Sequence, residues 1–369
     1  MERTVRSFFI FMLIMTPLFS QSRISPDHPG FQYMGRTDQR FPEKVIFDWP
    51  GVTIRTIFQG STCSAVMEGV NCFDAFVDGV LKATFCSKAV KATYLIAEGL
   101  TDRPHRLLIV KRSESAGAPS AFYGLVLDSG KSVFPPSPPS RRKIEFIGDS
   151  YTVGFSNEYL NRECPAGKDD SIMLTATNAY KAFGPLVARA FGAQYHLIAI
   201  SGKGLVRNYN GIDKGRELPR YYDRTLISSV NSTAKSALWD FSRWQADVAV
   251  IGLGINDFQA DPPHADSAAF DHAYLKLINR LRGQYPGVKI FCCATKVWPD
   301  DVLIPHVKGI VGRQNAAGEN DVFYFEYHTE NGALYGHPHI YDHQKIAREL
   351  IPLVSSATGW NRTDMVRGK

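Results

Sequence analysis

The pattern of hydrophobic and polar positions changes character once along the chain. From Gln32 to Val133, short alternating or apolar runs are separated by turn residues, and no stretch has a long helical period. The predicted strands are VIFDW, TIRTIF, FDAFVDG, ATYLIAEG, HRLLIVKRS and FYGLVLDSG. Short strands at close spacing are typical of a sandwich or barrel. We therefore predict a β-sandwich domain over residues 30–134.

A proline-rich segment follows the predicted sandwich. Phe134–Lys143 reads FPPSPPSRRK and contains four prolines. Such a composition favours a stiff, extended connection over a helix or a central strand. We therefore place a linker at residues 135–143 and begin the second domain at residue 144.

In the second domain, predicted strands alternate with predicted helices. Apolar residues recur at helical spacing in Asn178–Gly192 and in Phe270–Pro286. The strands are apolar runs that end near Gly148, Ser201 and Gly254, together with runs in Val288–Trp298 and Val322–Tyr327. Strands separated by helices imply a parallel sheet with right-handed crossovers. The prediction for residues 144–360 is an α/β domain of three layers, α/β/α, around a parallel sheet.

Composition and charge narrow the class of protein. Of the 369 residues, 44% are hydrophobic and 21% are charged, which is ordinary for a globular chain. The net charge is +6, but the basic residues are scattered and are not interleaved with aromatic residues. A nucleic-acid-binding surface normally concentrates its basic residues, so we predict no nucleic-acid partner. The sequence gives no prediction of oligomeric state.

The N-terminus has the features of a secretory signal peptide. Early arginines precede an apolar run from Phe8 to Phe19. That run is short for a membrane span but suits a signal peptide, which we assign to residues 1–22. We therefore predict a secreted, extracellular protein with no membrane association after cleavage. The alternative is an uncleaved membrane anchor.

Six cysteines follow the predicted signal peptide: Cys63, Cys72, Cys86, Cys164, Cys292 and Cys293. In an oxidising compartment they allow up to three bridges with many possible connectivities. We expect at least one bridge and assign no pairing. Their spacing does not match a zinc site.

Polar residues that can carry chemistry follow several of the predicted strands. The run in Lys143–Asn157 stops at Gly148-Asp149-Ser150, and later runs stop at Ser201-Gly202-Lys203-Gly204 and Gly254-Ile255-Asn256-Asp257. A histidine-rich loop then leads into an amphipathic helix within Tyr335–Val354. Ligands of open α/β sheets gather at the carboxyl ends of the strands. A serine at that edge is a candidate nucleophile if a base and an oxyanion site converge on it.

The order serine, glycine, asparagine, histidine resembles the SGNH (GDSL-type) hydrolases. Upstream, Phe47–Gly79 reads FDWPGVTIRTIFQGSTCSAVMEGVNCFDAFVDG. Its WPG turn and aromatic strand, with the later SGKGLVRNY block, resemble carbohydrate esterase family 2. That resemblance implies a jelly-roll sandwich before an SGNH domain, and an activity that removes acetyl groups from plant polysaccharides such as xylan and glucomannan. The implied partner is an acetylated polysaccharide or oligosaccharide.

The resemblance also assigns roles to individual residues. Ser150 is the expected nucleophile and His337 the expected base. The expected oxyanion donors are the backbone N–H groups of Ser150 and Gly202 and the side-chain amide of Asn256. Each such donor contributes about 3 kcal/mol to transition-state stabilisation. Gly204 is the alternative to Gly202, because SGKG can be aligned in two ways.

Two other histidines lie in the same loop. We expect His339 to be loop surface and His343 to cap or pack the start of the following helix, where Asp342 is also a capping candidate. The positions two and three before His337 are Tyr335 and Leu334, which cannot supply an orienting carboxylate.

We therefore predict a Ser–His dyad in which a backbone carbonyl orients the histidine, as the resemblance allows. A remote acid such as Asp300 or Asp301 is the alternative.

The remaining candidates concern the substrate and the turns. Trp298 follows a strand, and its ring can stack on a sugar or pack in the core. Arg207 and Asn208 are candidates for lining the cleft. Asp149 and Asp257 are interpreted as structural residues that hold turns. The chemistry needs no metal and no cofactor, and we predict neither.

Two other functions remain open from the sequence. The same catalytic domain could serve a lipid esterase or lysophospholipase. The missing aspartate leaves room for a weakly catalytic carbohydrate-binding protein.

Overall fold

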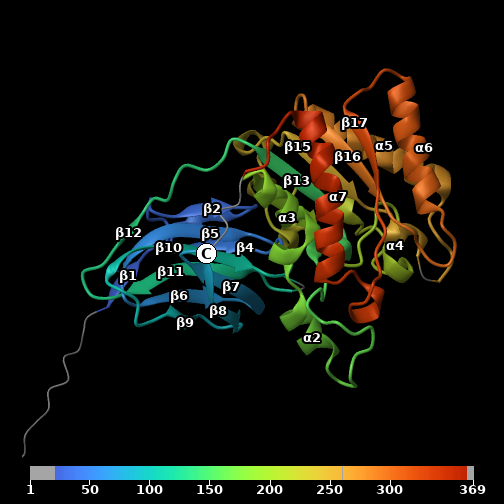
Figure 1. The fold of residues 1–369 in the computed structure, drawn as a ribbon. Helices are drawn as coiled ribbons and strands as arrows, with labels where there is room; N and C mark the ends of the chain where they lie inside the picture. Colours follow the sequence, from blue (N-terminus) through green and yellow to red (C-terminus); the bar gives the residue numbers. More distant parts are fainter. Residues whose placement is uncertain (1–20, 116, 260, 364–369) are drawn as a thin grey trace, which may run out of the picture.

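The computed structural model describes residues 21–363 except 116 and 260, and it contains two parts that lie side by side (Figure 1). The first part is a sandwich of two six-stranded antiparallel sheets, and the second is built on a five-stranded parallel sheet. This arrangement confirms the predicted fold class, a β-rich domain followed by an α/β domain.

One sheet of the sandwich has the order β3-β4-β11-β6-β9, with β1 paired to β11. Its strands are β1 (Ser22–Ile24), β3 (Asp38–Phe41), β4 (Lys44–Phe47), β6 (Cys63–Glu68), β9 (Ala92–Ala97) and β11 (Ser120–Leu127). The other sheet has the order β12-β5-β10-β7-β8, with β2 paired to β5. Its strands are β2 (Gln32–Met34), β5 (Thr53–Gly60), β7 (Asn71–Val77), β8 (Val80–Ser87), β10 (Arg103–Lys111) and β12 (Val133–Phe134).

Each of the six predicted sandwich strands overlaps an observed strand: β4, β5, β7, β9, β10 and β11. The sequence pattern missed β6 and β8 and the short strands β1, β2, β3 and β12. β6 contains small residues such as Ser64 and Ala65, and β8 carries Lys82 and Ser87, so neither has a strong strand signal of its own. Both strands are held by pairing with neighbours, which a local pattern does not record.

The second part begins with β13 (Lys143–Gly148). The sheet order is β14-β13-β15-β16-β17, and every pairing is parallel. The other strands are β14 (Gln194–Ala199), β15 (Val248–Gly252), β16 (Lys289–Ala294) and β17 (Val322–Glu326). The three central strands are buried along nearly their whole length, as expected when helices cover both faces of a parallel sheet.

The helices are α1 (Ser150–Val153), α2 (Asp169–Ala176), α3 (Phe183–Ala190), α4 (Ile255–Phe258), α5 (Ser267–Gln284), α6 (Leu303–Ala316) and α7 (Ile340–Thr358). Helix α3 packs against α7, and α5 packs against α6 (Figure 1). The three predicted helices are present, as α3, α5 and α7. The short helices α1 and α4 and the helices α2 and α6 were not predicted; α6 contains a proline and two glycines, which weaken a helical pattern.

Buried polar contacts join the two parts. Arg36 of the sandwich is fully buried beside Glu145 of β13, with 3.2 Å between the guanidinium and the carboxylate. The Asp48 carboxylate accepts hydrogen bonds from the backbone N–H groups of Ile227 and Ser228 at 2.7 and 2.8 Å. The Trp49 indole donates to the Thr225 carbonyl at 3.1 Å. The two parts are therefore joined by hydrogen bonds and an ion pair between them, and not only by the proline-rich segment that connects them along the chain.

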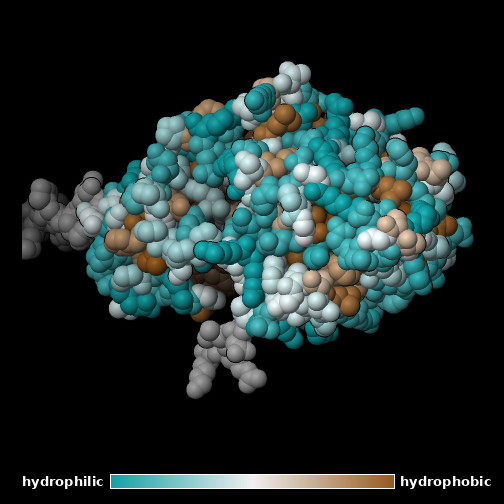
Figure 2. All heavy atoms as spheres, turned by 90° about the horizontal axis from the view of Figure 1, so that it is seen from above, coloured by the Kyte–Doolittle hydropathy of each residue, from teal (hydrophilic) through white to brown (hydrophobic). Residues whose placement is uncertain are grey.

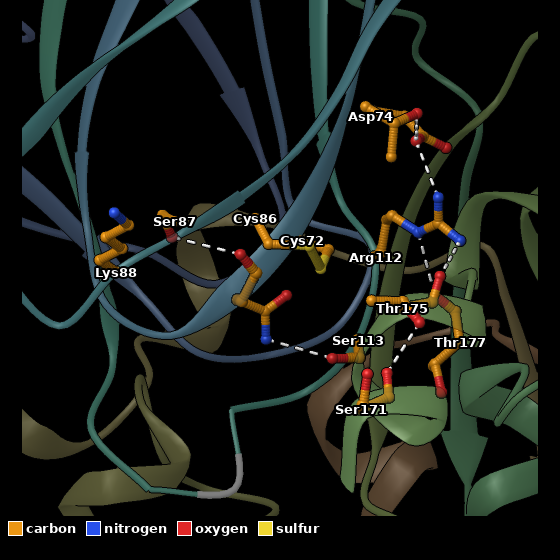
Figure 3. Close-up of a disulfide and its surroundings, with 12 residues drawn as sticks. Cys72, Asp74, Cys86, Ser87, Lys88, Arg112, Ser113, Ser171, Thr175 and Thr177 are labelled. Atoms are coloured by element: carbon orange, nitrogen blue, oxygen red, sulfur yellow. Dashed lines mark hydrogen bonds and ion pairs between the residues drawn. A yellow bond between two sulfur atoms is a disulfide. The ribbon is translucent and has the colours of Figure 1, made fainter. Parts of the chain in front are cut away.

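One disulfide joins Cys72 and Cys86, which face each other across β7 and β8 (Figure 3). This confirms the expectation of at least one bridge. All six cysteines lie in the described residues, and the other four are free thiols.

The surface is hydrophilic over most of the face seen in Figure 2, where apolar residues gather only in small separated groups. Among the described residues, no helix is long and apolar enough to cross a membrane. The predicted signal peptide, residues 1–22, falls almost entirely outside the described residues.

Candidate active site

The candidate residues gather at the carboxyl edge of the parallel sheet. Ser150 begins α1 directly after β13, and Asn256 lies in α4 just beyond β15. Gly202 lies in the loop after β14, and His337 lies in the loop before α7. Parallel strands bring all of these connections to one edge, which is where open α/β sheets place their ligands.

Ser150 and His337 are in direct contact. The His337 Nε2 atom lies 2.9 Å from the Ser150 Oγ atom, and the His337 Nδ1 atom lies 2.8 Å from the Leu334 carbonyl oxygen. A carbonyl oxygen can only accept, so Nδ1 must carry the ring proton and Nε2 must be the free acceptor for the serine hydroxyl. The pair therefore has the geometry of a nucleophile and its general base.

A tight turn places the Leu334 carbonyl under the histidine. Residues Leu334–Gly336 form one turn of 3-10 helix, and Tyr335 within it has a φ of +54°. A non-glycine residue in this left-handed region is uncommon and persists only when its surroundings hold it there. The Tyr335 N–H donates to the Arg162 carbonyl at 3.0 Å, which helps to hold this turn.

The surroundings of His337 favour its neutral form. The Phe155 ring centroid is 4.5 Å from that of the imidazole, and the Tyr151 centroid is 5.7 Å away. Burial lowers the pKa of His337 to about 4, although the hydrogen bond to the Leu334 carbonyl raises it. Because a buried cation loses hydration, the ring stays neutral and able to accept a proton well below neutral pH.

Asn256 ties three of the loops together. Its side-chain amide donates to the Lys203 carbonyl at 2.9 Å and lies 3.4 Å from the Asp149 carboxylate. These contacts link the connections after β13, β14 and β15, so the expected oxyanion donors are brought to the same place. Both N–H bonds of this amide therefore have acceptors within the protein, and the role of Asn256 as an oxyanion donor stays a prediction.

The backbone distinguishes Gly202 from Gly204. The Gly204 N–H donates to the Asn208 side chain at 3.2 Å, so it is already occupied. The Gly202 N–H has no acceptor among residues 21–115, 117–259 and 261–363. Gly202 also has a φ of +76°, a conformation that glycine adopts without strain. The geometry therefore favours Gly202 as the backbone donor.

Two buried aspartates hold the loops beneath the site. Asp257 accepts from the N–H groups of Leu205, Val206 and Arg207 at 2.8 to 3.1 Å. Asp149 caps α1 by accepting from the Tyr151 N–H at 3.0 Å. Burial raises the pKa of Asp149 to about 7 and that of Asp257 to about 6. These contacts match the structural roles expected from the sequence.

The residues predicted to contact the substrate differ in their exposure and in their hydrogen bonds. The Trp298 side chain is 73% exposed in the connection after β16, at the same edge of the sheet as Ser150. The Arg207 guanidinium donates to the carbonyls of Asn256, Gln259 and Asp261, so it braces the loop after β15.

Asn208 requires a correction. It is only 1% exposed, and its amide is used entirely within its own loop, accepting from Gly204 and donating to the carbonyls of Ile212 and Asp213. It supports the loop and does not line a cleft.

His339 was also assigned incorrectly to the loop surface. It is the N-cap of α7 and forms a capping box with Asp342, each side chain accepting from the other's backbone N–H. His343 is fully buried, and its Nδ1 atom accepts from the Phe183 N–H at 3.3 Å. Neither histidine contacts Ser150 in the described structure, whereas His337 does. Asp300 and Asp301 are not needed to orient His337, because the Leu334 carbonyl occupies its Nδ1 atom.

One contact from the sandwich reaches this site and was not predicted. The Glu114 carboxylate accepts a hydrogen bond from the Ser201 N–H at 2.9 Å, across 87 positions of sequence. Glu114 lies in the connection between β10 and β11, where a glutamate is unremarkable in sequence. Only the folded structure brings it beside the loop that carries Gly202.

The described residues contain no group of three or more histidine, cysteine, aspartate or glutamate side chains placed to hold a metal ion.

Comparisons with known proteins agree with this architecture. Residues 33–138 match the family model "Carbohydrate esterase 2 N-terminal", and residues 146–319 match "GDSL-like Lipase/Acylhydrolase family". A solved family two carbohydrate esterase from Clostridium thermocellum, in complex with cellohexaose, is 31% identical with a TM-score of 0.81. That match covers 90% of this chain and all of the other. The chain belongs to carbohydrate esterase family 2.

Two curated relatives extend the comparison. The chain is 34% identical to Cellulase/esterase CelE of Acetivibrio thermocellus over 90% of its own length, but it spans only 40% of that relative. It is 29% identical to an acetylxylan esterase / glucomannan deacetylase of Cellvibrio japonicus, over 94% of this chain and 96% of the relative. This family 2 chain is therefore a carboxylic ester hydrolase with a GDSL-type domain.

Proposed function

We propose that this family 2 esterase is a secreted carbohydrate O-acetyl esterase that removes acetyl groups from xylan or glucomannan. The observation that carries the proposal is the 2.9 Å contact between Ser150 Oγ and a histidine whose other nitrogen is tied to the Leu334 carbonyl. This arrangement supports a Ser–His mechanism in which the histidine is a neutral base.

The chemistry proceeds in two halves. In the first, His337 Nε2 takes the Ser150 proton as Oγ attacks the acetyl carbonyl carbon, giving a tetrahedral oxyanion. The N–H groups of Ser150 and Gly202 and the Asn256 amide stabilise that charge. His337 then gives its proton to the departing sugar oxygen, leaving an acetyl-enzyme.

In the second half, His337 takes a proton from water, which attacks the acetyl-enzyme. Collapse of the second oxyanion returns the proton to Ser150 and releases acetate. Apart from the substrate and this water molecule, every group that acts in the proposed steps belongs to the chain.

The substrate class rests on the relatives and on one exposed side chain. The Cellvibrio japonicus relative is named for xylan and glucomannan, and the Clostridium thermocellum structure holds a cello-oligosaccharide. An exposed tryptophan offers a flat apolar face of the kind that stacks on sugar rings, and Trp298 supplies one beside this edge.

Secretion is supported by the signal-peptide pattern of residues 1–22 and by the disulfide. Disulfides persist in oxidising compartments outside the cytosol, and the Cys72–Cys86 bridge fits such a location.

The deciding experiment measures acetate release from acetylated xylan, acetylated glucomannan and a short-chain aryl acetate. We compare the unmutated protein, Ser150→Ala, and Ser171→Ala as a matched control at an exposed serine. Release that vanishes only in Ser150→Ala is the expected result. Release that persists in folded Ser150→Ala would overturn the mechanism.

The same assay separates the other candidate functions. Hydrolysis of lysophospholipid or long-chain aryl esters, with none of the acetylated polymers, would point to a lipid esterase. Polymer binding without acetate release would point to a carbohydrate-binding protein.

A further inference from the structure

The β-sandwich reaches the catalytic edge through one short connection. Residues 112–115, between β10 and β11, contact the α/β part at two places. Arg112 donates to the carbonyls of Thr175 and Thr177 at 2.9 and 3.1 Å, and Glu114 accepts from the Ser201 N–H at 2.9 Å. Figure 3 shows Arg112 pointing from the sandwich toward Thr175 and Thr177, beside the Cys72–Cys86 bridge.

This connection is held from within the sandwich. The buried Asn71 amide donates to the Ser113 hydroxyl and to the Glu114 carbonyl, each at 3.1 Å. The Ser115 N–H donates to the Asp48 carbonyl at 2.9 Å, and the buried Lys111 ammonium donates to the Ser113 carbonyl. Three successive residues are thus anchored, so the Glu114 carboxylate is presented from a supported backbone.

The donor of this hydrogen bond, the Ser201 N–H, lies one residue before the candidate oxyanion donor Gly202. Fixing the Ser201 N–H holds the Ile200–Ser201 peptide, which is the neighbour of the peptide that carries the Gly202 N–H. On the other side, the Gly202 carbonyl accepts from the Tyr209 N–H at 2.9 Å. The Gly202 N–H lies between these two anchors and has no acceptor in the part of the chain that the structure describes. A donor held on both sides in this way is preorganised for a charge that appears only during the reaction.

We propose that Glu114 is a positioning residue for the esterase reaction, through which the β-sandwich aligns the Gly202 N–H in the oxyanion hole. The inference rests on the proposed function, because it assumes that Gly202 stabilises the oxyanion. The sandwich then completes the catalytic site in addition to covering one side of the α/β domain. Glu114 acts through Ser201 and does not itself contact the reacting atoms.

The test compares Glu114→Ala with Glu114→Gln. Glutamine keeps a side-chain oxygen that can accept from the Ser201 N–H, whereas alanine has none. With a short-chain aryl acetate, we expect Glu114→Ala to lower kcat at least tenfold with KM within about twofold. We expect Glu114→Gln to stay within about threefold of the unmutated kcat. A matched control is Glu68→Ala, which removes a sandwich glutamate bonded to the Tyr123 hydroxyl, and its kcat should not change.

The outcomes separate the two proposals. If the unmutated enzyme is active and depends on Ser150, but Glu114→Ala keeps its kcat, the positioning role is overturned and the esterase mechanism stands. If Glu114→Gln falls as far as Glu114→Ala, an accepted hydrogen bond at Ser201 is not what matters, and the inference also fails. Activity that survives Ser150→Ala would instead overturn the function on which the inference rests. Thermal unfolding of each variant confirms that comparisons are made between folded proteins.

Discussion

At the scale of single residues, the feature that sets this site apart is a histidine oriented by a neutral carbonyl. The Leu334 carbonyl fixes the tautomer and direction of His337, as a carboxylate does in a Ser-His-Asp triad. A carbonyl carries only a partial charge, so it stabilises the protonated ring less. The base is therefore kept neutral by its surroundings, and this has a measurable consequence.

The decrease of kcat/KM at acidic pH should have its midpoint near pH 4 and not near pH 6.5. Protonation of His337 removes the base, and burial lowers the pKa of this group to about 4, so activity should be retained as the pH drops through 6 and 5. A pH–rate profile on an aryl acetate checks this, with circular dichroism at each pH to confirm folding. An acid limb at 6 or above, in folded protein, would show that the free enzyme does not desolvate His337 as described.

The Leu334 side chain should matter for stability and not for chemistry. Leu334 is fully buried, so Leu334→Ala should cost about 2–5 kcal/mol of unfolding free energy. The carbonyl that orients His337 belongs to the backbone and remains. We expect kcat measured well below the melting temperature to stay within about threefold, whereas His337→Ala should lose roughly a thousandfold or more. A folded Leu334→Ala variant as inactive as His337→Ala would contradict the backbone assignment.

At the scale of elements, the loop after β14 is built around one carboxylate. Asp257, from α4, gathers three successive N–H groups of that loop, and Gly204 packs against this cluster. A Cβ atom on Gly204 would lie 1.9 Å from the Arg207 carbonyl and 2.6 Å from the Asp257 carboxylate. The loop that carries Gly202 therefore depends on a glycine two residues further on, although that glycine contributes no catalytic donor.

Gly204→Ala should displace this loop and lower kcat at least tenfold, because the new methyl group meets the Arg207 carbonyl of the loop and the Asp257 carboxylate that holds the loop. The measurement is aryl acetate turnover alongside thermal unfolding. Gly215→Ala is the matched control, since Gly215 has a φ of +81° but open space around it. The control should lose some stability and keep its kcat. Equal turnover in the two variants would mean that the loop tolerates the displacement.

At the start of α7, the position of each histidine relative to the helix determines what it does. Three histidines within seven positions appear equivalent in sequence, but helix geometry gives them different tasks. His339 caps the helix, His343 is buried one turn later, and His337 remains outside the helix to contact Ser150.

At the scale of the whole molecule, the sandwich and the α/β part share buried charge. Arg36 lies against Glu145 within a group of aromatic rings that includes Trp49, Tyr222 and Trp239. The Glu145 carboxylate also accepts from the hydroxyls of Tyr222 and Tyr285, at 2.7 and 3.1 Å. Such a contact makes each part dependent on the other for its stability.

Arg36→Met should therefore destabilise the chain by about 3–5 kcal/mol, because it leaves Glu145 buried without its cation. Arg103→Met is the matched control: its pair with Asp78 is exposed, and its loss should cost no more than about 1 kcal/mol. Urea unfolding measures both. A loss in Arg36→Met no larger than in the control would show that the interface does not depend on this pair. Two separate transitions in the unmutated protein would show that the parts unfold independently.

Much of the architecture follows from local pattern. The alternation of short apolar runs predicted a sandwich, and strands alternating with helices predicted a parallel sheet, because side-chain periodicity is set within a few residues. The sequence also indicated which residues follow strands or precede a helix at this edge of the sheet: Ser150, Gly202, Asn256 and His337. In the fold, Ser150 contacts His337, and Asn256 links the loops after β13, β14 and β15. Secretion, the catalytic roles and the polysaccharide substrate stay predictions that the experiments above test.

The sequence by itself determined the order of the elements and the residues from which a site could be built. Only the tertiary structure decided which of them come into contact. His337, and not His339, contacts Ser150, and Asn208 is buried. Three further pairs come together: Cys72 with Cys86, Arg36 with Glu145, and Glu114 with Ser201. The physical reason is the sequence separation over which each kind of interaction acts. Strand and helix patterns arise from neighbours along the chain, whereas a hydrogen bond between residues 87 positions apart exists only once the core has packed and brought two separate loops together.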